Sequence, residues 1–195
     1  MTFATVYCYP TSSRSNWLSD LGDYVGLKIE TKLKQETANY KEIFPLNKAP
    51  ALITPSGYKL TETIAIFTYI VDKSNKKEFL GITEEEKANN LKWLSFMNSD
   101  FVGALYPLIY FPEGLTMEEH IARISRFLKF IENELKIKTT KYLSSDEILI
   151  SDIFTVKTFD DVVGAGVDLS PYPEIVKYMD SVRPHPLMTR KQSFN

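Results

Sequence analysis

The sequence predicts two halves of different architecture, an α/β half with the element order βαβαββα and an all-helical half after it. Two observations support this division. Short β-branched and aromatic runs alternate with helical patterns through residue 73, whereas beyond residue 87 strand patterns fade and apolar residues recur at helical spacing. Residues 74–86 are polar, rich in lysine and then acidic. We therefore expect domains at 1–73 and 87–195, joined by a linker at 74–86.

The first three elements of the α/β half follow from composition and periodicity. Residues 3–9 are β-branched and aromatic and end before Pro10, which predicts a strand. Polarity rises at Ser12, and apolar residues then recur at helical spacing up to Gly26, which predicts a helix that ends at this glycine. Residues 27–33 alternate apolar and polar side chains, so we expect a second strand with one exposed face.

The remaining elements of this half are shorter. Residues 37–44 predict a short helix, followed by an irregular turn between Pro45 and Pro50. Residues 51–54 and 58–60 predict a hairpin, because Pro, Ser and Gly separate them. Residues 61–72 are apolar on nearly all sides and open with threonine and glutamate, which predicts a buried helix.

Two helices of the second half have explicit start signals. Thr83 with Glu86, and Thr116 with Glu119, show the spacing of a capping box, in which each side chain binds the backbone N–H of the other residue. Apolar residues at helical spacing follow both pairs. Residues 147–163 and 173–182 show weaker helical patterns and complete the predicted helical half.

Composition excludes several classes of protein. The net charge of −2 and the pI near 5.8 argue against direct nucleic-acid binding. No stretch approaches the roughly 20 apolar residues that span a bilayer, and the N-terminus lacks the pattern of a secretory signal. Cys8 is the single cysteine, so no internal disulfide can form. We expect a soluble protein of the cytoplasm, a reducing compartment, with no membrane partner.

Three motifs give a specific resemblance. They are Tyr-Pro-Thr-Ser-Ser at 9–13, Phe-Pro-Leu-Asn-Lys-Ala-Pro-Ala-Leu at 44–52 and Leu-Thr-Glu-Thr-Ile-Ala-Ile at 60–66. In this order they resemble the glutathione transferase superfamily, which implies a thioredoxin-like N-terminal domain followed by an all-α C-terminal domain. The resemblance implies glutathione as substrate or ligand and no metal. It places the catalytic hydroxyl on Ser12, a cis peptide bond before Pro50, and the glutathione-binding residues at Asn47, Lys48, Ala49, Pro50, Glu62 and Thr63.

The chemistry of such a site explains these residue types. A free thiol has a pKa near ~8.5 and is mostly protonated at neutral pH. A hydroxyl at a helix N-terminus stabilises the thiolate by hydrogen bonding and through the helix dipole, and Ser12 is placed to do both. The alternative is that Ser12 or Ser13 only caps the first helix. Cys8 lies on a buried strand and is expected to be a small core residue.

Several positions depart from the family pattern. Asn47 stands near a place where many members have a basic residue, for which Lys48 could compensate, and Thr63 replaces the usual serine. Before Asp152, Leu149 occupies the position of a capping serine or threonine, so we expect ~1 kcal/mol of helix-cap stability to be missing there. His120 and His185 have no partner at metal-ligand spacing and are expected at the surface or at caps.

A second resemblance covers nearly the whole chain. Residues 93–100 (WLSFMNSD) and 172–178 are similar to the fungal-like, eukaryotic glutathione-transferase-like domain of the elongation factor 1 gamma subunit. It implies an interaction domain of the translation elongation exchange complex, with the elongation factor 1B exchange subunit or aminoacyl-tRNA synthetases as partners and a homodimer as assembly. The alternative is an active transferase that conjugates glutathione to small electrophiles. We expect the scaffold, with the transferase as the competing hypothesis.

Overall fold

The computed structural model of the chain describes residues 1–110 and 114–189, so the last six residues of the predicted domain 87–195 lie outside it. The chain divides into two compact units, with main parts Met1–Leu80 and Gly81–Met188. The range expected as a linker, 74–86, contains the 3₁₀ turn η2 and the first residues of a long helix. In the described residues, no helix combines the length and apolar character needed to cross a bilayer.

The first unit has the predicted order βαβαββα with two added 3₁₀ turns. Its elements are β1 (Ala4–Cys8), α1 (Leu18–Val25), β2 (Ile29–Leu33), η1 (Lys34–Glu36), α2 (Tyr40–Ile43), β3 (Ala51–Ile53), β4 (Lys59–Thr61), α3 (Thr63–Asp72) and η2 (Lys77–Leu80). The sheet order is β2-β1-β3-β4, with β1 and β2 parallel and the other pairs antiparallel. The predicted strands and hairpin are confirmed, and the predicted cis bond is present between Ala49 and Pro50.

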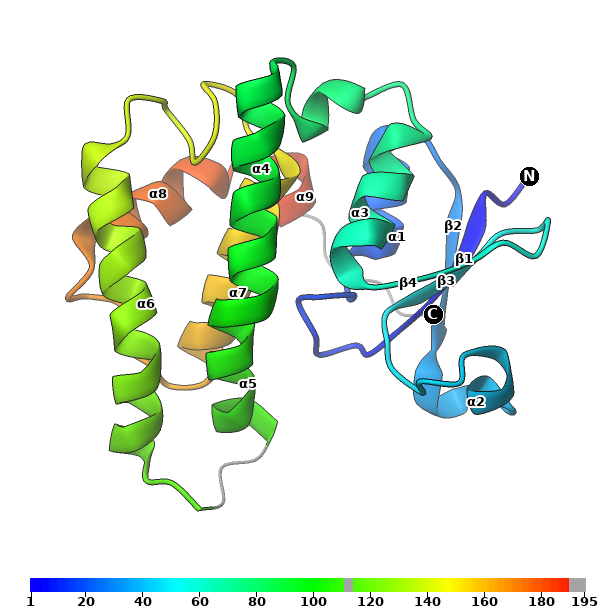
Figure 1. Cartoon of the computed structure of the whole chain (residues 1–195), viewed down its shortest axis with the longest axis horizontal. Coiled ribbons are helices and arrows are strands. Elements are labelled where there is room, and N and C mark those ends of the chain that lie inside the picture. The colour runs from blue at the N-terminus through cyan, green and yellow to red at the C-terminus, as the bar shows by residue number, and fades with distance from the viewer. Residues whose placement is uncertain (111–113, 190–195) are drawn as a thin grey trace. The chain divides into compact units, whose positions relative to one another are not determined.

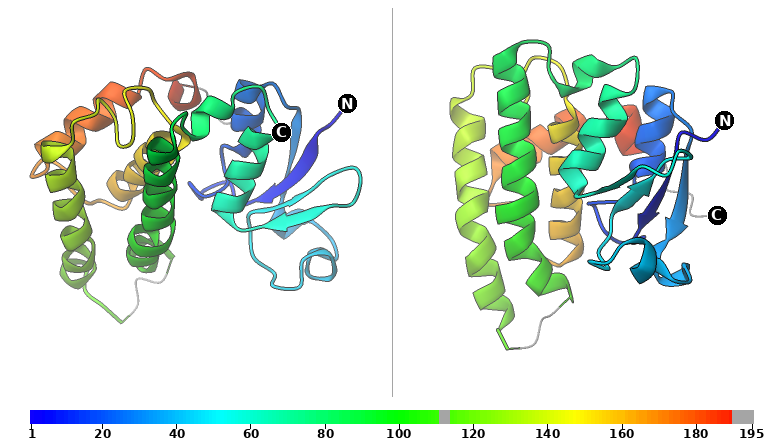
Figure 2. Two further views of the ribbon diagram at one scale, coloured as in Figure 1. Left: turned by 45° about the horizontal axis from the view of Figure 1, so that its top comes forward. Right: turned by 45° about the vertical axis from the view of Figure 1, so that its right-hand side comes forward.

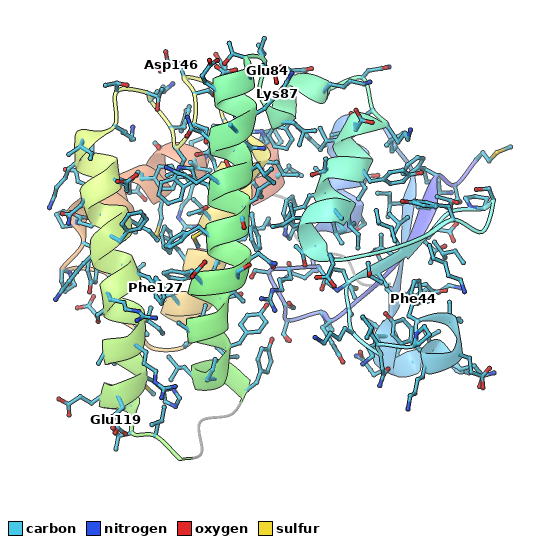
Figure 3. All side chains as sticks on the ribbon, viewed as in Figure 1. Phe44, Glu84, Lys87, Glu119, Phe127 and Asp146 are labelled. Atoms are coloured by element: carbon cyan, nitrogen blue, oxygen red, sulfur yellow. The ribbon has the colours of Figure 1, made fainter. Side chains whose placement is uncertain are left out.

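Different elements pack on the two faces of the sheet. Figure 1 shows α1 and α3 side by side on one face of the sheet. On β1 the alternate residues Ala4, Val6 and Cys8 are fully buried. Tyr7 lies on the opposite face and packs with Tyr40 of α2 and with Phe44, whose ring centroids are 5.4 and 5.6 Å from its own. Figure 3 shows Phe44 beside α2.

The helical part of the chain has longer elements. They are α4 (Glu84–Phe96), the π-helical turn η3 (Met97–Phe101), α5 (Val102–Tyr110), α6 (Met117–Ile137), α7 (Ile150–Gly164), α8 (Pro173–Val182) and α9 (Pro186–Thr189). Both views of Figure 2 show α4 and α6 as long neighbouring helices. The two predicted capping boxes are present, with Thr83 and Thr116 accepting from the N–H of Glu86 and Glu119 at 3.1 and 3.2 Å. Figure 3 shows Glu84 and Glu119 at these helix starts.

The start of α7 is capped by another helix. Leu149 is 3% exposed and carries no acceptor, but Asn90 of α4 accepts the N–H of Ser151 through Oδ1 at 3.1 Å. Asp152 in turn accepts the N–H of Leu149 at 2.8 Å. The hydrogen bond from Ser151 to Asn90 of α4 therefore compensates for the cap that Leu149 cannot provide. A serine or threonine in place of Leu149 could restore a local cap but would remove a buried leucine, so we do not expect this substitution to raise stability.

The start of α8 is capped in a similar way from α6. Glu132 is 5% exposed, and its two carboxylate oxygens accept the N–H groups of Glu174 and Ile175 at 3.3 and 3.0 Å. Lys136 lies 3.2 Å from the same carboxylate. Because the first N–H groups of a helix have no partner within it, such acceptors satisfy groups that would otherwise be buried and unpaired. Cross-helix capping thus joins α4 to α7 and α6 to α8.

Asp152 is the buried polar centre of this unit. Its carboxylate also accepts the Tyr178 hydroxyl at 2.7 Å and the Leu143 N–H at 3.1 Å. Burial nevertheless raises the pKa of Asp152 to about 6, and the three hydrogen bonds from Tyr178, Leu149 and Leu143 lower it only in part. Burial, together with the charge of Asp152, raises the pKa of Tyr178 well above its usual value, so this hydroxyl stays a donor.

Replacement of Asn90 by alanine tests the cross-helix cap. The substitution leaves the N–H of Ser151 buried without an acceptor, so we expect the free energy of unfolding to fall by about 1–3 kcal/mol in urea titrations. Asn133→Ala, at an exposed position of α6, is the matched control and should stay within about 0.5 kcal/mol. Equal effects of the two substitutions would contradict the cap.

The pH dependence of stability tests Asp152. Its pKa is raised from 3.8 unfolded to about 6 folded, so the native state holds more protons between these values. The contribution of Asp152 to stability is therefore present below pH 4 and is lost as the pH rises through about 6. We expect the unfolding free energy of the wild type, minus that of Asp152→Asn, to decrease from pH 4 to pH 6.5. An increase would show that the three donors outweigh burial.

Candidate functional site

The predicted site segments all join the sheet at the same end of its strands. Tyr7 of β1 pairs with Ala51 of β3, and Ala51 pairs with Thr61 of β4. On the other side of β1, the parallel strand β2 ends together with it, where Cys8 pairs with Leu33. Since neighbouring strands lie about 4.8 Å apart, the segments that follow β1, β2 and β4 and the one that precedes β3 start close together.

The three sequence motifs lie at this end of the sheet. The loop with Ser12 leaves the sheet after β1, Pro50 directly precedes β3, and Glu62 directly follows β4. Pro50 and Glu62 thus flank adjacent strands, next to the paired residues Ala51 and Thr61. The predicted site residues therefore come from one end of the sheet, although more than fifty residues separate Glu62 from the start of β1.

The turn after β1 is held by its own backbone and by Ser15. The Tyr9 carbonyl accepts the Ser12 N–H at 3.4 Å and the Ser15 hydroxyl at 3.3 Å, and the Ser15 oxygen accepts the Tyr9 N–H at 3.2 Å. Ser12 is 6% exposed, and its carbonyl accepts the N–H groups of Ser15 and Asn16, both at 2.9 Å. The Trp17 indole donates to the Ser13 carbonyl at 2.7 Å. The turn thus has a defined conformation around Ser12.

The position of Ser12 relative to the first helix differs from the prediction. The regular helix α1 begins at Leu18, and its N-cap residue is Trp17, which forms no side-chain cap. Residues 13–17 form turns, and the Ser12 carbonyl before them accepts the Asn16 N–H in a single i to i+4 hydrogen bond. Ser12 therefore precedes α1 in the chain and is not its N-cap residue.

The loop before Pro50 is bound by two side chains that the motif does not include. Lys34 Nζ donates to the Asn47 carbonyl at 2.6 Å and to the Tyr9 hydroxyl at 2.9 Å. Tyr40 Oη donates to the Lys48 carbonyl at 2.6 Å. Burial first, and the neighbouring tyrosines second, raise the pKa of Tyr40 to about 12, so its hydroxyl remains a donor at neutral pH.

Sequence reasoning missed Lys34, although the sequence contained a signal for it. Lys34 directly follows the predicted strand 27–33. Because this strand pairs in parallel with the first strand, both strands end at the same end of the sheet. A lysine at this end of β2 is therefore close to any site built after β1. Asn47 and Lys48, predicted as binding residues, both have exposed side chains, and Asn47 has a left-handed φ of 52°.

The start of α3 offers backbone N–H groups that precede its first helical hydrogen bond. Glu62 is the N-cap residue, with a φ of 70° and an exposed side chain that makes no cap hydrogen bond. Its carbonyl accepts the Ile66 N–H at 3.0 Å, so the N–H groups of Thr63, Ile64 and Ala65 precede the first helical hydrogen bond. Such N–H groups suit a carboxylate. Thr63 is 3% exposed at this end of the sheet.

Other candidate groups do not belong to this site. Cys8 is fully buried, and burial raises the pKa of its thiol to about 11, as expected for a core residue. His120 is 1% exposed within α6, which corrects the expectation that it lies at the surface or at a cap. His185 accepts the Leu187 N–H at 3.2 Å. Across residues 1–110 and 114–189, His, Cys, Asp and Glu form no group of three that could hold a metal.

Comparisons with known proteins identify the family. Residues 4–72 match the family described as glutathione S-transferase, N-terminal domain. The chain is 41% identical over 190 residues to glutathione S-transferase Y-2 of Pichia kudriavzevii, covering 96% of this chain and 98% of that protein. A crystal structure of a glutathione S-transferase from the same organism superposes with a TM-score of 0.86, covering 96% of this chain and 95% of the other.

The expectation of an elongation factor scaffold is overturned by these matches. Elongation factor 1-gamma of Schizosaccharomyces pombe is 32% identical over 164 residues, which cover 79% of this chain but only 39% of that protein. The resemblance to that protein is real, but the glutathione S-transferase is more similar and matches over nearly its full length. With this similarity, the βαβαββα unit and the helical unit after it, the chain belongs to the glutathione S-transferase family.

Proposed function

We propose that this protein is an active glutathione transferase that conjugates the thiol of glutathione to small electrophiles. The register that places the Ser12 turn, Pro50 and Glu62 at one end of the sheet carries this proposal. Relatives named as glutathione S-transferases support it, since the similarity to one of them extends over 96% of the chain.

In the proposed binding mode, each part of glutathione meets a matching group. The γ-glutamyl carboxylate binds the N–H groups at the start of α3, and Glu62 contributes a negative charge for the γ-glutamyl ammonium. The backbone next to the cis bond of Pro50 binds the cysteinyl part, and Lys48 supplies a positive charge for the glycyl carboxylate. These roles combine the family resemblance with the location of each residue at this end of the sheet.

The proposed reaction needs a thiolate and a donor that stabilises it. The thiol of free glutathione, with a pKa near ~8.5, is largely protonated at neutral pH. The hydroxyl of Ser12 donates to the sulfur, which favours the thiolate, and the thiol proton goes to solvent. The sulfur then attacks the electrophilic carbon, forming a C–S bond, and the leaving group departs with the bonding electron pair.

Ser12→Ala tests this mechanism. Loss of one charge-assisted hydrogen bond should reduce the conjugation rate at pH 6.5 about tenfold or more. The apparent pKa of the pH–rate profile should move up toward that of free glutathione, because the thiolate loses its donor. Rates are measured by absorbance with a chloronitrobenzene substrate between pH 6 and 9.

The control for this test is Ser19→Ala, a serine of α1 in the same unit, which should leave the profile unchanged. An unshifted profile for Ser12→Ala would remove Ser12 from the mechanism while leaving the activity established. A wild-type protein that neither binds immobilised glutathione nor conjugates it to a panel of electrophiles would refute the proposed function itself. A homodimer and a cytoplasmic location stay predictions from the resemblance.

A further inference from the structure

Lys34, which directly follows β2, contacts three separate segments of the first unit. Its Nζ donates two hydrogen bonds, to the Asn47 carbonyl at 2.6 Å and to the Tyr9 hydroxyl at 2.9 Å. It also lies 5.3 Å from the ring centroid of Tyr9 and 5.6 Å from that of Tyr40, within cation–π range. One ammonium group therefore links the turn after β1, the helix α2 and the loop before Pro50.

The two carbonyls before Ala49 are turned in a defined direction. The Asn47 carbonyl accepts from Lys34, and the Lys48 carbonyl accepts from Tyr40, whose ring is itself next to the Lys34 ammonium. The C=O and N–H of a trans peptide unit point in opposite directions. The N–H groups of Lys48 and Ala49 are therefore turned away from Lys34 and Tyr40.

These two N–H groups are available to a ligand. In the described part of the chain, neither donates a hydrogen bond to the protein, and both lie outside the strands and helices. Asn47, between α2 and Pro50, has a left-handed φ of 52°, a conformation that asparagine adopts more readily than most residues. Loss of the ammonium would free the 47–48 peptide to rotate, and the N–H of Lys48 would lose its fixed direction.

We propose that Lys34 is a positioning residue for glutathione. By holding the Asn47 carbonyl it orients the backbone donors next to the cis bond of Pro50 toward the peptide groups of the bound tripeptide. This inference rests on the proposed function and adds to it a residue that the sequence motifs do not contain. Lys34 takes no part in the chemistry at sulfur, so it contributes to glutathione affinity and not to turnover.

Steady-state kinetics of Lys34→Met test the proposal, since methionine keeps an apolar stem and removes the ammonium. We expect the KM and the equilibrium Kd for glutathione to rise about fivefold, as for the loss of one partly exposed charge-assisted hydrogen bond. The kcat and the KM for the electrophile should stay within about twofold. Lys34→Arg, which retains charge and donors, should recover most of the affinity. Lys34→Gln replaces the first variant if that variant unfolds below the assay temperature.

Lys41→Met is the matched control, because Lys41 is an exposed lysine of α2 in the same unit. It should leave the KM for glutathione unchanged. A purely structural role for Lys34 predicts a lower Tm with an unchanged KM, and this result would overturn the inference while the transferase activity stands. A wild type without glutathione binding would instead refute the proposed function, and the inference with it.

Discussion

The pairing of β3 between β1 and β4 is the constraint on which the candidate site depends. Tyr7, Ala51 and Thr61 lie in one row across the sheet, so the chain segments next to them lie close together at one end of the sheet. A shift of this register by one residue would turn the buried side chains of a strand to its opposite face. The fully buried residues Val6 and Leu52, which pair with each other, fix the register through the core. Core packing thus determines the geometry of the site.

The opposite face of the same strands supports the loop before Pro50. Tyr7 and Ala51 pack against Tyr40 and Phe44, and this aromatic cluster holds α2, which is only four residues long. Lys59 of β4 adds a hydrogen bond to the Ile43 carbonyl at 3.1 Å. A helix this short is not stable alone. The position of α2 therefore depends on side chains of the sheet. The loop between α2 and Pro50 depends on the same contacts.

The sequence predicted the order of elements because each has a local signal, but several boundaries follow from tertiary contacts. The helix expected from Ser12 begins at Leu18, because Ser15 binds both backbone groups of Tyr9 and closes a turn that competes with helix formation. No local pattern reveals this contact. The capping boxes at Thr83 and Thr116 were predictable since both partners are three residues apart. The cap that Asn90 provides for the N–H of Ser151 joins residues 61 positions apart, so no local pattern could predict it.

The same distinction explains which site residues the sequence could supply. Ser12, Pro50 and Glu62 belong to contiguous motifs, so a resemblance locates them, whereas Lys34 lies in no motif and becomes relevant only through the parallel pairing of β1 and β2. Its contact with Asn47 joins residues 13 positions apart. In the proposed mechanism the Ser12 hydroxyl stabilises the thiolate by a hydrogen bond, whose geometry requires a fixed backbone. The contacts of Ser15 and Lys34, outside the motifs, hold the backbone of the turn after β1 and of the loop before Pro50.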